Sequence, residues 1–304
     1  MPPIAEGRPK GFVKSVAHRE ASSSFDHRLL VKRYRSHQGT PTPEHPLRIA
    51  STVANVDRAV GGSLSNAVVS DHGPDGLAGD SIQVQLKGSA GQTCGAWLAA
   101  GVTIAVEGDV NDYAGKGLSG GVLAVYPAGE SHFAAAENVI AGNVTLYGAT
   151  RGRAFFSGRV GERFAVRNSG ALAVAEGVGE HACEYMTGGC VVVIGPTGQN
   201  FGAGMSGGIA FVHNPDGTLA ARTNHQLVDL DPVNPGREPA LRELLEEHLL
   251  RTGSAGAREL LSRWDSAVEE FTLVIPRGYK EAMARMAEER EQQVSSSSSE
   301  GAAA

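Results

Sequence analysis

The stretch GKGLSGG at residues 115–121 places four glycines in seven residues, and GAGMSGG at residues 202–208 nearly repeats it. A short run of aliphatic and β-branched residues follows each stretch, VLAVYP from Val122 and IAFVHNP from Ile209. A phosphate-binding loop would instead lead from its glycines through Lys-Ser or Lys-Thr into a helix. Because Lys116 lies inside the glycine run, we interpret both stretches as tight turns that precede strands.

Glycine recurs with a period of about 20 residues through the middle of the chain. Of the 40 glycines, 27 fall within Gly88–Gly217. Gly101 and Gly121 are 20 residues apart, and Gly189 and Gly208 are 19 apart. A short strand and a glycine corner in each repeat are typical of a solenoid, and glycine tolerates the positive φ and close backbone approach that corners need. The pattern therefore predicts an all-β parallel solenoid followed by a helical segment.

The expected corners and domain boundaries follow from this pattern. We expect structural corner glycines at Gly101, Gly117, Gly120, Gly121, Gly142, Gly189, Gly204, Gly207 and Gly208. Residues 1–48 are polar and irregular and predict an N-terminal arm, and residues 49–220 form the solenoid. Leucines at helical spacing predict a helical extension over residues 221–290. The serine-rich residues 291–304 predict a disordered tail.

Composition narrows the class of protein. The formal net charge of −6 gives no reason to expect a nucleic acid or an anionic membrane as partner. No apolar run approaches the roughly 20 residues of a membrane helix. The first residues lack the apolar core of a secretory signal, so we expect a cytoplasmic location.

The cysteines are the first candidates for chemistry. Cys94, Cys183 and Cys190 are too widely spaced for a typical metal or iron–sulfur motif, which favours buried structural thiols. A cysteine nucleophile would need a histidine beside it, and His181 lies two residues before Cys183. We expect no catalytic, cofactor-binding or metal site in this chain.

Two charged clusters leave their roles open. Glu107, Asp109 and Asp112 could serve as acid and base in a sugar-cleaving enzyme, or could simply be solvated or cap turns. In GRVGERFAVRNSG, three arginines recur at every fourth residue beside an asparagine, a pattern that suits an interface or internal corner pairing. The candidate interdomain contacts are Arg159, Arg163, Arg167 and Asn168.

Longer blocks resemble a known family. The blocks at residues 88–121, 142–189 and 191–212, with NVDRAVGGSLS before them and LLSRWDSAVEEFTLVIPRGYK after them, are similar to the C-terminal GXGXG domain of glutamate synthase large chains. The resemblance covers roughly residues 50–285. It implies that the solenoid is a right-handed parallel β-helix.

The resemblance also implies a function that needs a larger assembly. Enzymes of that family turn glutamine and 2-oxoglutarate into two glutamates and pass ammonia through an internal tunnel. Their large chain contains a glutaminase domain and a barrel that binds FMN and an iron–sulfur cluster. This chain is then expected to bind none of these cofactors, to be inactive alone, and to pack the glutaminase and FMN-barrel portions together. These portions, in the same or a separate chain, are the expected partners, with the small flavoprotein subunit as a further candidate.

Two alternatives stay open at this stage. Stand-alone relatives of this domain serve in other amidotransferases and in formylmethanofuran-dehydrogenase-type oxidoreductases, which would make the chain a subunit of such an assembly. A carbohydrate-active β-helix enzyme is the other alternative, favoured only by architecture, which is a poor guide to function.

Overall fold

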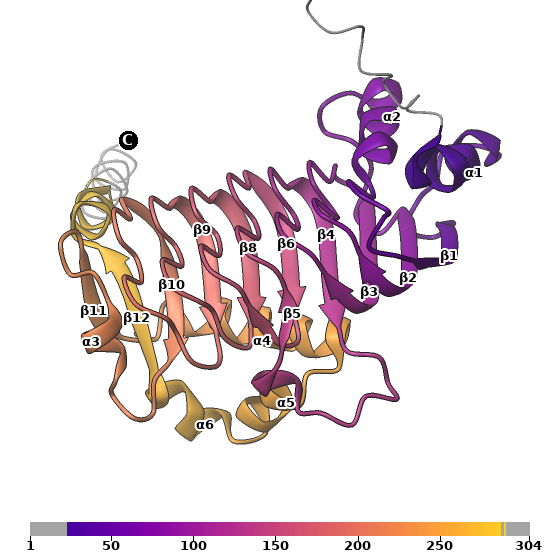
Figure 1. Ribbon diagram of the computed structural model, residues 1–304. Coiled ribbons are helices and arrows are strands. Elements are labelled where there is room, and N and C mark those ends of the chain that lie inside the picture. Colours follow the sequence, from indigo (N-terminus) through magenta and orange to yellow (C-terminus); the bar gives the residue numbers. More distant parts are fainter. Residues whose placement is uncertain (1–22, 287–288, 290–304) are drawn as a thin grey trace, which may run out of the picture.

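The fold is built on one twelve-stranded mixed sheet that stays open at both edges (Figure 1). The computed structural model describes residues 23–286 and residue 289. The predicted disordered tail at 291–304 and the first 22 residues of the predicted arm lie outside the described residues. The strands run in the order β1-β2-β3-β4-β6-β8-β9-β10-β12-β11, and β5 and β7 continue from the end of β3 as a short side ladder.

The strands and helices have the following bounds. The strands are β1 (Leu47–Val53), β2 (Ile82–Ala90), β3 (Val102–Val110), β4 (Ser119–Tyr126), β5 (Val139–Ala141), β6 (Arg151–Phe156), β7 (Arg159–Val160), β8 (Ser169–Ala175), β9 (Thr187–Val193), β10 (Gly207–His213), β11 (Val228–Pro232) and β12 (Phe271–Pro276). The helices are α1 (Lys32–Ser36), α2 (Gly62–His72), α3 (Leu219–Arg222), α4 (Glu238–Thr252), α5 (Ala255–Ser262) and α6 (Trp264–Ala267), with short π- or 3₁₀-helical turns at Asp26–Val31, Ala135–Glu137 and Val268–Glu270.

The period of about 20 residues is the register of the parallel pairing. Ile82 pairs with Val102, Thr103 pairs with Val122, and Ala173 pairs with Val191. Each repeat thus contributes one strand, and the next repeat places its strand alongside in parallel. A longer connection with the 3₁₀ turn and β5 separates β4 from β6.

The prediction of an all-β, right-handed parallel β-helix is wrong. The sheet is mixed, because β12 pairs antiparallel with both β10 and β11, and helices cover one face of it. The stretches NVTLYG at residues 143–148 and RFAVRN at residues 163–168 are turns and not strands. Their short β-branched runs resemble strands, but the backbone there has positive φ at alternate residues, which no strand adopts.

Six turn segments share this unusual backbone. They are residues 93–97, 113–117, 144–148, 163–167, 181–185 and 200–204, and we call them the turn segments. In each one the first, third and fifth residues have φ between 53° and 70°. In five of the six segments the N–H of the fourth residue donates to the carbonyl of the first, such as Lys116 to Tyr113 at 3.1 Å, which makes a tight turn with positive φ at the third position. In the segment at residues 163–167 the corresponding tight turn begins two residues later, where the N–H of Asn168 donates to the carbonyl of Ala165 at 3.1 Å.

The turn segments stack by hydrogen bonds in both directions. The N–H group of Gly117 donates to the carbonyl of Tyr147 in the next turn segment, and that of Tyr113 donates to the carbonyl of Asn143, which directly precedes this segment, each at 2.9 Å. The N–H group of Gly115 donates to the carbonyl of Cys94 in the preceding segment, at 2.8 Å. The same alternation recurs in later segments, so backbone groups that a turn would otherwise leave unpaired are satisfied.

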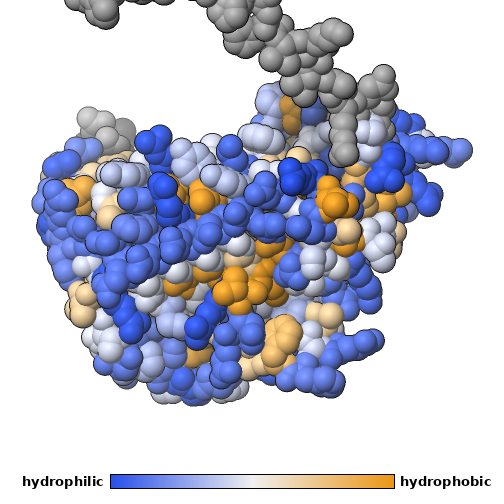
Figure 2. Space-filling model, viewed as in Figure 1, coloured by the Kyte–Doolittle hydropathy of each residue, from blue (hydrophilic) through white to orange (hydrophobic). Residues whose placement is uncertain are grey.

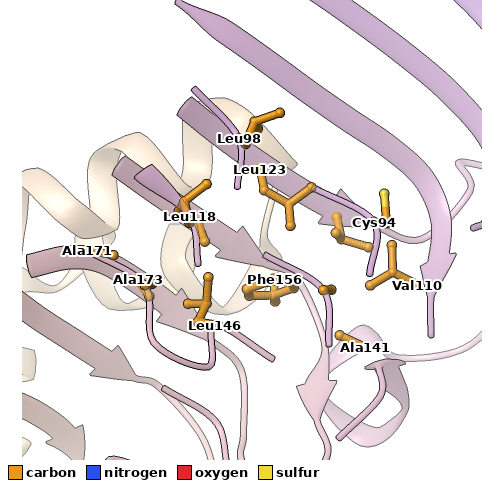
Figure 3. Packing of buried hydrophobic residues seen from close by; sticks show 14 of the residues in the cluster. Cys94, Leu98, Val110, Leu118, Leu123, Ala141, Leu146, Phe156, Ala171 and Ala173 are labelled. Carbon is orange, nitrogen blue, oxygen red and sulfur yellow. The ribbon is translucent and has the colours of Figure 1, made fainter. Parts of the chain in front are cut away.

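Two hydrophobic cores lie on opposite faces of the sheet. The first fills the space between the strands and the turn segments, and Figure 3 shows Leu118, Leu123, Leu146 and Phe156 within it. The second lies under α4, α5 and α6 and takes alternate residues of the same strands, such as Phe155 of β6. Because side chains alternate across a strand, one sheet supplies both cores.

A buried carboxylate holds the helical extension against the sheet. Glu176, just after β8, accepts hydrogen bonds from Ser157 at 3.1 Å and from Ser254, which caps α5, and His248 of α4 lies 3.6 Å away. Burial opposes ionisation of Glu176, but His248 and the two hydroxyl groups outweigh it and lower the pKa of the carboxyl.

A second ionic contact fixes the C-terminal end of α4. Arg251 donates to both oxygens of Asp80 at 2.9 Å, and Thr103 donates to the same carboxylate at 2.6 Å. The Arg251 guanidinium lowers the pKa of Asp80, and Thr103 adds to this effect while burial opposes it. Asp80 has φ 60°, a conformation that Asp and Asn adopt more easily than other side chains.

The Asp80–Arg251 pair should make stability depend on pH. A carboxyl whose pKa is lower in the folded state stabilises fully above its unfolded pKa of about 3.9, and this contribution is lost as pH falls through the folded value. Asp80→Asn keeps the backbone preference, so we expect a loss of about 1 kcal/mol at pH 7 for this partly exposed pair. Urea unfolding from pH 7 to pH 3 should show the gap closing. Asp75→Asn, at an exposed surface pair, is the control, and a constant Asp80→Asn gap would contradict the assignment.

Crowding at Gly208 gives a second prediction. Gly208 has φ 72°, and a Cβ there would lie 2.7 Å from the backbone of Gly188. Gly217 has a similar φ of 68° but open space around it. Gly208→Val should lower the free energy of unfolding by about 3 kcal/mol, and Gly217→Val by about 1 kcal/mol, because only the first adds overpacking to backbone strain. Equal chemical-denaturation midpoints for the two variants would show that backbone crowding contributes nothing at Gly208.

Candidate interdomain interface

The predicted corner glycines occupy two kinds of position. Gly101, Gly117, Gly120, Gly189, Gly204 and Gly208 have positive φ. Gly121, Gly142 and Gly207 have no such φ, but a Cβ at each would lie within 2.6 Å of a neighbouring atom. At Gly121 that neighbour is the side chain of Leu98 or the carbonyl of Val102, and at Gly207 it is the carbonyl of Thr187. The second group is needed for close approach between repeats rather than for turning.

The arginines of the predicted interdomain contact differ in exposure and in their partners. Arg163 and Arg167 are the first and fifth residues of one turn segment, and both side chains are exposed. Arg163 lies 3.4 Å from Glu184 of the next segment, and Arg159 donates to the carbonyl of Ala136 at 2.8 Å. Exposed guanidinium groups that are only partly paired remain able to bind a partner.

Asn168 has an internal role instead. Its side chain has no exposed surface. Its amide group donates to the carbonyl of Ala171 at 2.9 Å, and its side-chain oxygen accepts from the N–H groups of Gly170 and Ala171 at 3.2 and 2.9 Å. These bonds close the turn before β8 and leave Asn168 no surface for a partner, so we exclude it from the candidate interface.

Exposed aromatic side chains in other turn segments were not singled out from the sequence. Trp97 and Tyr185 occupy the fifth place of their turn segments and are 54% and 52% exposed. A Cβ added at Gly117 would lie 2.8 Å from the Trp97 ring, and one at Gly204 would lie 2.5 Å from the Tyr185 ring. Each ring therefore lies against a glycine of the next segment, where a larger residue would clash with it.

A cation completes the aromatic surface at one end. The Lys116 ammonium lies 5.8 Å from the centre of the Trp97 ring and 5.5 Å from that of the Tyr113 ring. The spacing of 20 residues between Trp97 and Gly117 equals the repeat, and this signal could have revealed the pairing. Figure 2, viewed from the side opposite α4, shows a mainly hydrophilic face with apolar residues near its centre. Trp, Tyr and Arg are the residue types that most often dominate binding energy at interfaces.

The side chains considered as candidates for catalysis or metal binding are buried or lie apart from one another. Cys94, Cys183 and Cys190 are buried free thiols, which confirms the structural interpretation, and burial raises their pKa values, to about 12 for Cys94 and Cys190. A buried thiol with a raised pKa is a poor nucleophile. Among the described residues, no group of three His, Cys, Asp or Glu side chains is arranged to hold a metal ion.

The three carboxylates that are close together in the sequence have different partners in the structure. Glu107 pairs with Lys87 at 3.0 Å, and Asp109 accepts a hydrogen bond from Ser89 at 2.8 Å. Asp112 accepts one from the backbone N–H of Asn143 at 2.8 Å and so caps a turn. Each carboxylate thus has a structural partner of its own, and the geometry does not favour a shared acid–base pair.

A comparison with known protein families finds a glycine motif that corresponds to the turn segments. A family model described as the GXGXG motif matches residues 35–277. The chain belongs to the GXGXG family. The motif has glycine at every second residue, and the turn segments have positive φ at every second residue. Glycine adopts positive φ easily, so the motif corresponds to the backbone conformation of these segments.

The relatives of this GXGXG chain include glutamate synthases. It is 51% identical over 248 residues to "Glutamate synthase [NADH]" of Schizosaccharomyces pombe, 43% identical over 244 residues to "Glutamate synthase [NADPH] large chain" of Bacillus subtilis, and 41% identical over 248 residues to "Ferredoxin-dependent glutamate synthase 2" of Synechocystis. These matches cover 80–81% of the chain, and they confirm the resemblance to glutamate synthase large chains. The GXGXG chain spans only 12% of the first relative and 16% of the other two.

Membrane insertion through a helix has no candidate segment. Over residues 23–286 and residue 289, every helix of the GXGXG chain is too short or too polar to cross a bilayer.

The contact between Tyr185 and Gly204 gives a test of the aromatic surface. Gly204→Ala should cost about 2 kcal/mol in unfolding free energy, because it combines a clash with the ring and a φ of 67°. Tyr185→Ala should recover about half of that loss in the double variant, because it removes the clash but leaves the strain. Denaturant unfolding of the four proteins forms a double-mutant cycle. Additive effects would show that the ring does not lie against Gly204.

Proposed function

We propose that this chain is the GXGXG portion of a glutamate synthase and acts as a rigid, non-catalytic support. In this proposal it packs the glutaminase and FMN-binding portions together around the ammonia tunnel, and the iron–sulfur cluster and flavin belong to those other portions. The observation that carries the proposal is 51% identity to a glutamate synthase of which the match covers only 12%.

The architecture is consistent with a support. Two cores, one on each face of a single sheet, and hydrogen bonds in both directions between turn segments leave little freedom for the repeats to move. The candidate reactive groups of the described chain are buried thiols and separately paired carboxylates. A role in positioning other portions therefore fits better than a role in catalysis.

The choice of electron donor does not belong to this portion in our proposal. Relatives named for NADH, NADPH and ferredoxin are 51%, 43% and 41% identical to the chain. Similarity of this order across three donors suits a module that serves the step common to all of them.

We place the contact with the other portions at the turn segments. Arg163, Arg167, Tyr185 and Trp97 lie on exposed ends of rigid segments, so little entropy is lost when they bind. The arginine forks suit carboxylates on the partner.

Co-expression with the remaining portion of a glutamate synthase large chain tests the proposal. We expect the isolated chain to form no glutamate, and the co-purified complex to convert glutamine and 2-oxoglutarate to glutamate. Arg163→Ala should weaken co-purification about tenfold while leaving the melting temperature within about 2 °C, because the side chain is exposed. Arg258→Ala, an exposed arginine of α5 outside the turn segments, is the control for the turn-segment contact.

Two results would contradict the proposal. If the soluble wild-type chain does not assemble with the soluble remaining portion of the large chain, the proposed supporting role is wrong. Hydrolysis of a polysaccharide by the purified chain would favour a carbohydrate enzyme. A lower melting temperature with unchanged binding for Arg163→Ala would place that arginine in folding rather than in the interface.

A further inference from the structure

A groove lies on the outer face of the sheet, beyond the C-terminal end of α4. It has a volume of about 680 Å³, and strands β1 to β4 form its floor. Ala50 of β1, Ala105 of β3 and Ala124 of β4 keep the floor low, and Gln85 of β2 occupies the matching position between Ala50 and Ala105. Such small side chains allow another element to approach the sheet closely.

The groove continues the path that α4 follows. Figure 1 shows α4 crossing behind β8, β6 and β4, while β1 to β3 extend beyond its end. Along this path the outward residues change from Phe155, Val174 and Ala124, which are buried in the core under the helices, to the half-buried Ala105 and the exposed Ala50 of the groove. The groove is therefore the uncovered part of a surface on which a helix already packs.

The rim of the groove combines an apolar anchor with ordered polar groups. Leu250, near the end of α4, lines the groove and is 82% exposed, although it is a large aliphatic side chain. Gln85 donates to the Tyr126 hydroxyl at 2.7 Å, and Arg48 donates to Gln83 at 3.2 Å. Arg48 retains further donors, so an acidic side chain is the complementary group on an occupant.

We propose that a helix of the remaining glutamate synthase chain packs in this groove, end to end with α4. This inference rests on the proposed function and names a second contact, separate from the turn segments. The occupant presents small and apolar side chains to the alanine floor, covers Leu250, and places a carboxylate near Arg48. The relatives are much longer than this chain, which spans only 12–16% of them. In this proposal the occupant belongs to the remaining part of such a protein.

Filling the groove tests the inference. Ala105→Trp places a large ring on the floor, and Leu250→Asp puts a charge at the anchor. Val56→Asp is the matched control, since Val56 is 84% exposed and does not line the groove. Each variant is co-expressed with the remaining portion of the large chain, and the bound fraction and the melting temperature of the free chain are measured. We expect at least a tenfold loss of binding for both groove variants and no loss for Val56→Asp.

The outcomes separate this inference from the proposed function. If the wild-type chain assembles and both groove variants assemble equally well, the groove is not the contact, and the proposed function stands. If the wild-type chain does not assemble, both fail. Sedimentation of the chain alone tests the other occupant. A dimer that Leu250→Asp abolishes would overturn the inference in favour of a second copy of this chain.

Discussion

The structure depends on a backbone that places every second residue of six turn segments at positive φ. Twelve of these eighteen positions carry a side chain, including the β-branched Val144, for which this conformation is costly. The cost is offset because each segment pairs with the segments before and after it. A single segment would gain little from this conformation, so the stack must form as a whole.

This backbone determines how side chains are distributed. The middle residues of a turn segment, such as Phe164 and Ala165, face the core, while Arg163 and Arg167 at its ends stay exposed. One side of the sheet therefore receives a core from the turn segments, and the other side is free to bind helices. The second core under α4 to α6 uses that freedom, and the ionic contacts of Glu176 and Asp80 fix the helices in place.

Exposed groups gather on two surfaces that differ in chemistry. The ends of the turn segments carry arginines and aromatic rings that lie against glycines, and the groove beyond α4 offers a floor with small side chains and the exposed Leu250. Both surfaces lie on rigid elements, which suits a support that holds larger portions in a fixed relation. Under the proposed function, the buried thiols and the separately paired carboxylates have structural roles.

The sequence by itself determined the repeat and the family, because glycine spacing and long motif blocks are local properties of the chain. It also indicated the helices after Gly217, since leucines at helical spacing mark one face. Only the tertiary structure decided that residues 143–148 and 163–168 are turns, because their conformation is held by hydrogen bonds to neighbouring repeats. It alone separated buried Asn168 from the exposed arginines and placed Tyr185 against Gly204. Such contacts join residues about 20 positions apart, and only the register of the folded sheet brings them together.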